Sequence, residues 1–456
     1  MSNTLNSGLK VRHLTMMGLG SAIGAGLFLG TGVGIQAAGP SVIIAYVIAG
    51  AVTVCIMQML AEMVAARPSS GSFATYADQA FGAWAGFSVG WAYWFMQVLI
   101  IGVEITGASA IISGWFGIAP WIPALIAVVF FAAINLSAVR GFGEFEFWFA
   151  LIKVVAIIVF LVIGILMVVG WFPGLDAVGT SNIDSVGFMP NGIGGIATAM
   201  LAVAFAFGGI ELVTIAAAES ENPKEAVGAA IRSAIWRIAV FYIGSVLLII
   251  LLLPYDQIAG ADSAAESPFT LVLDKANISG AATIMEVVIA LALLSACNAQ
   301  IYGNSRLLYS MARGHDAPTY FAQTNNSGVP VRAVVVSILF TLVSVVLQWW
   351  NPPGLLPFLL NAVGGILIAI WAMVILSYIK LHPQLVASGE VTEVRMWGYP
   401  WLPWLTLATL GGFILLMLFD AGGRTELISA IVVVTTIVVI SFIVHRGKAT
   451  QPAELA

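Results

Sequence analysis

The stretch Gly20-Ser21-Ala22-Ile23-Gly24-Ala25-Gly26-Leu27-Phe28 lies in the middle of an apolar run over residues 14–36. Glycine costs a helix about 1 kcal/mol relative to alanine, so a cluster of glycines marks a place where the helix is expected to break. A second such stretch, Ala206-Phe207-Gly208-Gly209-Ile210-Glu211, lies in the middle of the run over residues 193–217. These two interrupted apolar runs decide the fold predicted below.

The rest of the chain is a succession of similar apolar runs. Of its 456 residues, 60% are hydrophobic and only 9% are charged, against roughly 25% charged in an average soluble protein. No soluble core could hide so much apolar surface, and the runs are too long and too uniformly apolar for the alternating strands of a membrane barrel. Since a membrane helix needs about 20 apolar residues, we predict an all-α polytopic membrane protein with about 12 transmembrane helices. They are expected near residues 14–36, 40–64, 84–112, 121–139, 146–170, 193–217, 233–253, 284–310, 333–349, 355–379, 401–419 and 427–444.

The distribution of positive charges predicts the orientation, because cytoplasmic loops carry an excess of Lys and Arg. With the N-terminus inside, only Lys275 and Arg424 fall outside, and Lys153 lies within a helix. Both termini, the tails 1–13 and 445–456, are therefore expected in the cytoplasm. The first run is too long for a cleaved signal peptide and is followed at once by another span. The cytoplasmic cations would be Lys10, Arg12, Arg67, Arg140, Lys224, Arg232, Arg237, Arg306, Arg313, Arg332, Lys380, Arg395, Arg446 and Lys448.

In this orientation the two interrupted helices run antiparallel. Interrupted helices at corresponding positions of two halves are typical of transporters built from inverted repeats. Irregular backbone at membrane depth is tolerated only where it lines a cavity or is covered by protein. The two breaks are thus the candidate binding site.

The chemistry of the breaks suits an α-amino acid. Freed amides of Gly24, Ala25 and Gly26 would attract an anionic group. Freed carbonyls of Ser21 and Ala22, with those of Phe205 and Ala206 opposite, would accept hydrogen bonds from an ammonium. The alternative is that the glycines only allow close helix packing, a pattern that Gly26-Gly30-Gly34 also fits.

Three ionisable residues lie within predicted spans, where burial of a charge is costly and usually functional. Glu104 lies in the third helix, Glu211 follows the break of the sixth, and Lys153 lies in the fifth. A buried Lys or Glu can load and release a proton near neutral pH, so we predict that these residues couple transport to protons. The alternatives are that the Lys153 side chain extends to the cytoplasmic surface and that Glu104 is a protonated carboxyl hydrogen-bonded to a neighbouring helix.

Other functions find little support in the sequence. The net charge of −5, from 17 Lys+Arg and 22 Asp+Glu, and the lack of a basic stripe argue against nucleic-acid binding. Gly86-Phe87-Ser88-Val89-Gly90 matches the nucleophile-elbow pattern, but it lies inside an apolar helix, and the four histidines lie at helix ends or in loops. The two cysteines, Cys55 and Cys297, form neither a disulfide framework nor a zinc spacing. We therefore expect no enzyme activity, no metal and no cofactor.

Several motifs resemble one known family. The Gly20–Phe28 stretch is similar to the helix-one signature of the amino acid–polyamine–organocation superfamily, and the other motifs are similar to its bacterial amino-acid permeases. The likeness is strongest to aromatic amino-acid permeases, those of actinobacteria first, and next to 4-aminobutyrate permeases. These other motifs are Glu62-Met63 with Pro68-Ser69-Ser70-Gly71-Ser72-Phe73, Gly143-Glu144-Phe145-Glu146-Phe147-Trp148-Phe149 with Lys153, Phe207-Gly208-Gly209-Ile210-Glu211, and Asn304-Ser305-Arg306-Leu307-Leu308-Tyr309 with Gly314 and Ala317-Pro318.

The resemblance implies a fold with a 5+5 inverted repeat, with broken helices 1 and 6 and two peripheral helices. The repeats would cover residues 14–170 and 193–379, and the peripheral helices residues 401–444. It also implies proton-driven import of an amino acid by alternating access through the bacterial inner membrane.

The resemblance further assigns roles to single residues. The substrate carboxylate would meet the amides near Gly24–Gly26, and its amino group the carbonyls near Ala22, Ile23 and Phe205. Phe205 matches an aromatic gate, and Lys153 matches a lysine that occupies a sodium site in related transporters. Glu104 and Glu211 match recurrent acidic positions. The remaining wall of the pocket would be largely apolar: Ile101, Gly102, Val103, Ala206, Phe207 and Gly208, with Ala296 or Asn361.

The sequence thus predicts a secondary active transporter that imports neutral L-amino acids with protons, aromatic ones ahead of others. Its partners would be the amino acid, protons and the lipid bilayer, and the protein would be a monomer or a weak homo-oligomer. Two alternatives stay open: a proton-coupled importer of another amino acid, such as 4-aminobutyrate or a branched-chain one, and an amino-acid exchanger of the same fold. A membrane sensor that binds an amino acid without moving it is a third, though no signalling domain is evident.

Overall fold

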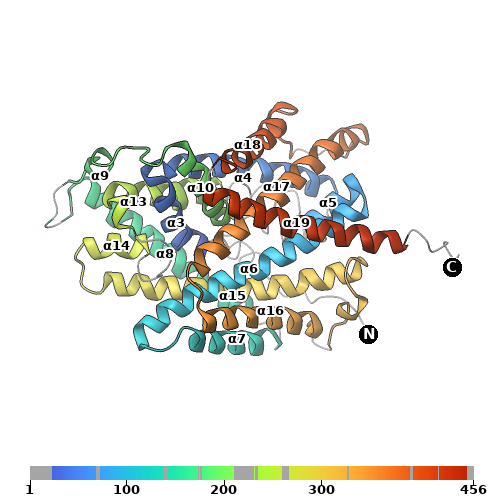
Figure 1. Ribbon diagram of the computed structural model, residues 1–456, viewed down its shortest axis with the longest axis horizontal. Coiled ribbons are helices and arrows are strands. Elements are labelled where there is room, and N and C mark those ends of the chain that lie inside the picture. The colour runs from blue at the N-terminus through green and yellow to red at the C-terminus, as the bar shows by residue number, and fades with distance from the viewer. Residues whose placement is uncertain are drawn as a thin grey trace.

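All regular elements in the described part of the chain are helices (Figure 1). The computed structural model describes residues 23–67, 72–136, 142–172, 174, 177–209, 231, 235–258, 267–325, 328–390, 394–419 and 421–448. The long helices are α4 (Val42–Ala66), α6 (Ala83–Phe116), α7 (Trp121–Leu136), α8 (Phe142–Val168), α10 (Gly192–Phe207), α13 (Ser245–Leu252) with the π-helical turn η3 (Ile238–Gly244), α15 (Ala281–Arg313), α16 (Val331–Trp350), α17 (Leu355–Ala387), α18 (Trp401–Met417) and α19 (Ala421–Lys448). The short ones are α2 (Ala25–Phe28), α3 (Gly30–Ala38), η1 (Gly39–Ser41), α5 (Ser72–Phe81), α9 (Ser181–Asp184), η4 (Tyr255–Gln257), α14 (Pro268–Lys275) and η6 (Thr319–Phe321).

Each predicted apolar run contains a described apolar helix, and the shorter elements, such as α5 and α14, lie between the runs. Eight described segments are long and apolar enough to cross a membrane, and the first, Ala25–Ala66, contains two helices joined at the turn η1. Three shorter apolar helices, α7, α10 and α18, complete the set of twelve. The prediction of an all-α polytopic membrane protein is confirmed. The division into two repeats stays a prediction, and the tail 1–13 lies outside the described residues.

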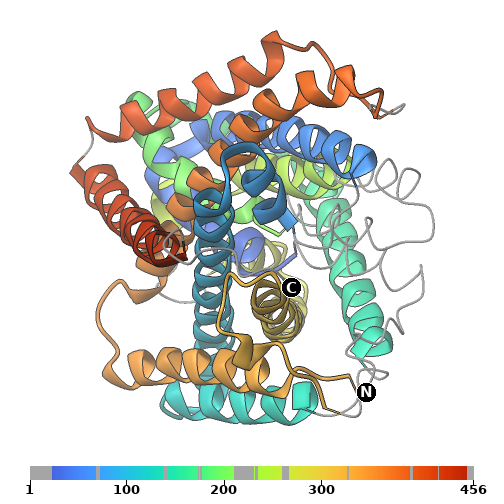
Figure 2. The same ribbon diagram turned by 90° about the vertical axis from the view of Figure 1, so that its right-hand side faces the viewer.

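The centre of the bundle is formed by α6 and α15, which cross it side by side (Figures 1 and 2). In Figure 2, α7 and α16 lie next to each other along the lower edge, where they cover one side of this pair. At the periphery, α8 and α19 turn many apolar side chains outward, among them Ile152, Val155 and Ile443. Lipid, rather than protein, is the natural neighbour of such faces.

The described part of the first run, α2 and α3, packs antiparallel against α10, as predicted. A Cβ added to Gly26 would lie 2.6 Å from Ala206 Cα, and one added to Gly195 would lie 2.6 Å from the Ala37 carbonyl oxygen. Between these contacts, Gly30 faces the carbonyl of Ala202. Residue numbers that rise on one helix while they fall on the other show the opposite directions. Glycine allows the backbones to approach this closely.

Candidate functional site

The first helix break carries a buried carboxylate. The helix begins at Ala25, with Gly24 as its N-cap, so the Ala25 N–H has no carbonyl of a preceding turn to bind. It donates instead to the Glu104 side chain on α6, at 3.1 Å from Oε1 and 3.2 Å from Oε2. Only 3% of Glu104 is exposed. The break therefore binds an acidic side chain that belongs to the protein itself.

Gly24 leaves room for this carboxylate. A Cβ at this position would collide with Glu104 Oε1 and would lie 3.3 Å from the Cβ of Ala296 on α15. Gly26, in contrast, faces the backbone of α10. The close-packing interpretation thus fits Gly26 and Gly30, whereas Gly24 faces the ionisable group.

The second break follows directly after α10. Phe207 is the last helical residue, Gly208 is extended, and Gly209 has a φ of +88°, a conformation that L side chains rarely adopt. The Gly208 N–H donates to the Phe205 carbonyl at 2.9 Å. The helix therefore ends inside the predicted run over residues 193–217, and the part of that run after Gly209 lies outside the described residues. The Phe205 carbonyl, which was expected to face an ammonium, thus accepts a hydrogen bond from the Gly208 N–H in this conformation.

Lys153 is buried within the bundle. It lies on α8 with 1% of its surface exposed, and its charge is within Coulombic range of the Glu104 carboxylate. A lysine that reached the membrane surface would expose its ammonium. The burial of Lys153 argues against an extension of its side chain to the cytoplasmic surface. It also places a base, Lys153, near the acid Glu104 at the first break.

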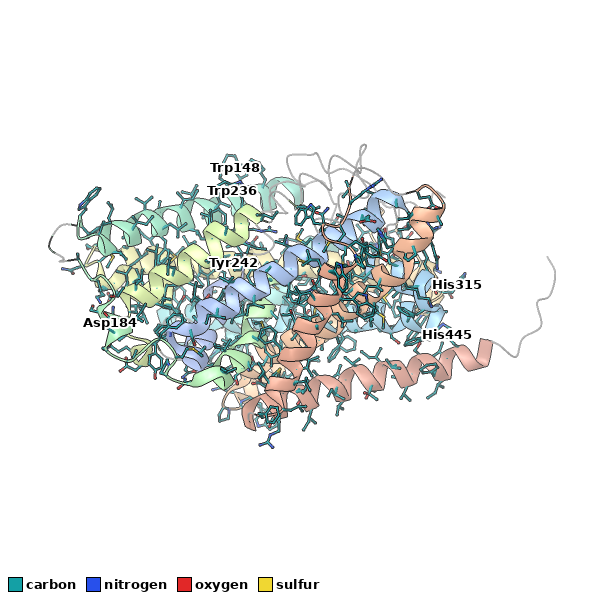
Figure 3. The ribbon with its side chains drawn as sticks, turned by 90° about the horizontal axis from the view of Figure 1, so that it is seen from above. Trp148, Asp184, Trp236, Tyr242, His315 and His445 are labelled. Atoms are coloured by element: carbon teal, nitrogen blue, oxygen red, sulfur yellow. The ribbon has the colours of Figure 1, made fainter. Side chains whose placement is uncertain are left out.

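The aromatic residues at the second break are packed in a cluster. The Phe207 ring lies 5.9 Å from the Tyr46 ring and 5.0 Å from the Tyr242 ring, between centroids. Tyr242, in the π-helical turn η3, lies well inside the bundle in Figure 3, whereas Trp148 and Trp236 project from its edge. Phe205 lies closer to the first helix, with a ring carbon 3.8 Å from a Cβ built on Gly30.

The other predicted wall residues are buried but divided between two regions. Val103, Ala206 and Ile23 belong to the main core. Ile101 packs in a second apolar cluster with Cys297 and Val345, where α6 meets α7, α15 and α16. The Ile101 side chain therefore lies on a different face of α6 from the one that packs into the main core. Asn361 donates to Glu426 on α19.

Three predicted site residues lie outside the described residues: Ser21, Ala22 and Glu211. Other residues near the first break were not predicted. Tyr46 is within 2.9 Å of the Thr31 hydroxyl, which donates to the Leu27 carbonyl at 2.6 Å. Ser267 donates to the carbonyl of Phe28 at 2.8 Å. A polar side chain inside an apolar run was the available signal for Thr31 and Tyr46. Among the described residues no group of three His, Cys, Asp or Glu side chains could hold a metal ion.

A second buried carboxylate lies at the end of the bundle where α4 and α17 terminate. Glu62 accepts from the Tyr378 hydroxyl at 2.8 Å and from the Met396 N–H at 2.6 Å, and it lies 2.6 Å from His382 Nδ1. His315 and His445 lie at one end of the molecule and Asp184 at the other (Figure 3).

An ion pair closes the same end at the surface. Arg67, just after α4, donates from Nε and Nη2 to the two carboxylate oxygens of Glu390, at 2.6 and 3.1 Å. These hydrogen bonds lower the pKa of Glu390 from 4.5 to about 2 and raise the pKa of Arg67. The end of α4 is therefore tied to the residues after α17 by a buried and an exposed carboxylate.

Comparison with known proteins places these features in one family. A family model described as amino acid permease matches residues 13–453. The aromatic amino acid transport protein AroP of Corynebacterium glutamicum is 62% identical over 440 residues, which cover 96% of this chain and 95% of the relative. The gamma-aminobutyric acid permease of Bacillus subtilis is 40% identical, over 97% of this chain and 94% of its own length. The AroP protein of Escherichia coli K12 is 37% identical, over 92% and 91%.

Proposed function

The chain belongs to the amino acid permease family, and on that premise we propose that it imports neutral, aromatic L-amino acids together with protons by alternating access. Membership and the apolar helices make it a multi-pass protein of the bacterial membrane. Its relatives are transporters rather than enzymes. The termini are expected on the cytoplasmic side.

The proposed substrate class rests on the relatives and on the site. A relative named as an aromatic amino acid transport protein is 62% identical, and the residues around the breaks are mostly apolar or aromatic, such as Phe205 and Phe207. Relatives named as gamma-aminobutyric acid permeases are 40% identical, which makes 4-aminobutyrate the main competing substrate.

One observation carries the proposed mechanism: the Ala25 amide donates to the carboxyl group of Glu104. The amide that we assign to the substrate carboxylate is thus able to bind a carboxylate in this environment. Two carboxylates cannot share one N–H and would repel each other at that distance. Substrate therefore has to displace Glu104 before it can use this amide.

Protonation of Glu104 provides the displacement. A neutral carboxyl is a weaker acceptor than a carboxylate, so a proton loosens the bond to Ala25 and frees the amide for the substrate. On the far side of the membrane, the substrate leaves, Glu104 releases its proton, and the carboxylate binds the amide again. The charge of Lys153 favours the ionised form of Glu104 and so the final step. Glu211 remains a third candidate for coupling.

The test uses purified protein in liposomes with an inward proton gradient and radiolabelled phenylalanine. We expect accumulation that unlabelled tyrosine and tryptophan suppress, while 4-aminobutyrate and lysine do not. Suppression by 4-aminobutyrate instead would overturn the substrate class. Uptake that needs internal amino acid and ignores the gradient would replace import with exchange.

A further inference from the structure

A row of buried polar side chains runs from Glu104 along the contact between α6 and α15. Antiparallel neighbours define the register of the two helices: a Cβ on Gly107 would lie 2.9 Å from Leu293 Cδ1, and one on Gly90 would lie 3.2 Å from Met311 Cε. Between these contacts, Gln97 Nε2 donates to Gln300 Oε1 at 2.5 Å. These three contacts show which residues of α6 and α15 lie at the same height in the bundle.

On each helix, the polar residues continue from the first break along one face. Gln97 precedes Glu104 by seven residues, which is close to two turns. On α15, Gln300 and Asn304 follow Ala296 at intervals of four residues. The register places Asn304 between Gln300 and Leu308, and Leu308 packs with Trp94 of α6. The row ends about 15 Å from Glu104, at 1.5 Å per residue.

Several polar atoms of this row have no hydrogen-bond partner in the protein. These are Gln97 Oε1, Trp94 Nε1 and both amide atoms of Asn304. Asn304 is completely buried, and 2–3% of Gln97 and Trp94 is exposed. A buried polar atom left without a partner costs roughly 1–3 kcal/mol. Buried amides of this kind are normally satisfied by ordered water.

Polar side chains inside a membrane domain that face its interior mark pathways for ions or substrate. The row leads from the carboxyl group at the first break towards the end of the bundle where α6 begins and α15 ends, and its last members lie beside the apolar cluster of Trp94 and Leu308. That end is the cytoplasmic one in the expected orientation. The proposed import requires Glu104 to release its proton towards this end. The side chains of the row are amides and an indole, which do not titrate, so they cannot pass the proton on by themselves.

We infer that Gln97, Gln300, Asn304 and Trp94 line a file of ordered water that carries the proton of Glu104 to the side where α6 begins. In each turnover the carboxyl proton passes to the first water and an excess proton leaves at the far end, so that charge and atoms balance. Lys153, Tyr242 and Cys297 are titratable groups within Coulombic range of Glu104. None of them belongs to the row.

The inference rests on the proposed proton coupling and predicts a separation of two activities. Exchange of labelled for unlabelled amino acid at equal pH leaves the proton on Glu104, whereas net uptake requires its release. Asn304→Leu in proteoliposomes should therefore lower gradient-driven phenylalanine uptake at least tenfold and leave exchange within twofold of wild type. Gln97→Leu should act in the same direction.

The matched control is Asn135→Leu. Asn135, on α7, is a buried amide that donates to Asn298 of α15 at 2.9 Å, on the side of α15 that faces α7. It should retain both activities. Undiminished net uptake in Asn304→Leu would overturn the water file.

If Asn304→Leu loses both activities, Asn304→Ser decides, because serine is small and can still bind water. Recovery of both activities supports the file, and a loss of both in the serine variant as well shows a structural amide and overturns it. A failure of the proposed function is seen separately, because wild-type protein would then show no gradient-driven uptake.

Discussion

Two buried carboxylates, Glu104 at the first helix break and Glu62 at the end of α4, differ in how completely they are bound. Glu62 is fully buried and has a hydroxyl, a backbone amide and an imidazole as partners. Within the described part of the chain, both oxygens of Glu104 accept from one N–H, that of Ala25. A carboxylate with a full set of partners is costly to move, whereas one held by a single amide can be replaced there by another anion.

The comparison separates a structural acid from a functional one. Both residues are buried glutamates, so neither residue type nor burial alone identifies function. The number of partners, and whether a substrate could compete for them, distinguishes the two. The experiments below test that distinction, from the largest expected effect to the smallest.

The strongest test removes the space in front of Glu104. Gly24→Val should abolish phenylalanine binding and uptake, a loss of more than 100-fold, because its side chain would collide with the Glu104 carboxylate and approach Ala296. Binding and uptake are measured after the amount of inserted protein is determined. Gly411→Val, at a helical glycine of α18 with open space around its Cβ, is the control and should behave as wild type. Normal uptake by Gly24→Val would remove the first break from the site.

The next test keeps the shape of Glu104 and removes its charge. Glu104→Gln mimics the protonated form, so phenylalanine should bind with an affinity that no longer depends on pH, and uphill uptake should fall roughly 100-fold. Lys153→Ala should also lose gradient-driven accumulation. Binding is measured by equilibrium binding of labelled phenylalanine between pH 5 and 8. Unchanged uphill uptake in both variants would exclude this pair from coupling.

The equivalent change at the other carboxylate should affect stability instead. Glu62→Ala leaves Tyr378, His382 and the Met396 amide without their shared acceptor, and loss of one member of a buried polar cluster typically costs about 3–5 kcal/mol. We expect a lower melting temperature in detergent, measured by thermal unfolding. The protein that remains folded should still bind phenylalanine with wild-type affinity. A fully stable Glu62→Ala that cannot bind would reverse the assignment of the two acids.

The smallest effect is expected at the exposed pair of Arg67 and Glu390. Since the pKa of Glu390 is lowered to about 2, the ion pair contributes stability above about pH 4.5, the ordinary value, and that contribution is lost as pH falls through about 2. Glu390→Gln should abolish this part of the pH dependence and leave transport unchanged, because solvent and salt screen exposed pairs. The melting temperature between pH 2 and 6, for wild type and variant, is the measurement. Identical curves would show that the pair contributes nothing.

The sequence alone determined the features that depend on neighbouring residues. The twelve helices follow from apolar runs long enough to cross a membrane, and the two breaks follow from glycines at their centres. The family could be identified for the same reason, since its motifs are short and contiguous. Glu104 and Lys153 stood out because a charge within an apolar run is rare, whatever it contacts.

Only the tertiary structure decided which residues meet. Ala25 and Glu104 are 79 positions apart, and Glu62 and His382 are 320 positions apart. Residue order alone could not distinguish the acid at the break from the one at the end of α4, and it could not place Ile101 away from the main core. Such contacts depend on how helices distant in sequence pack in three dimensions, and the spacing of residues along one helix fixes the face of a side chain but not its neighbour.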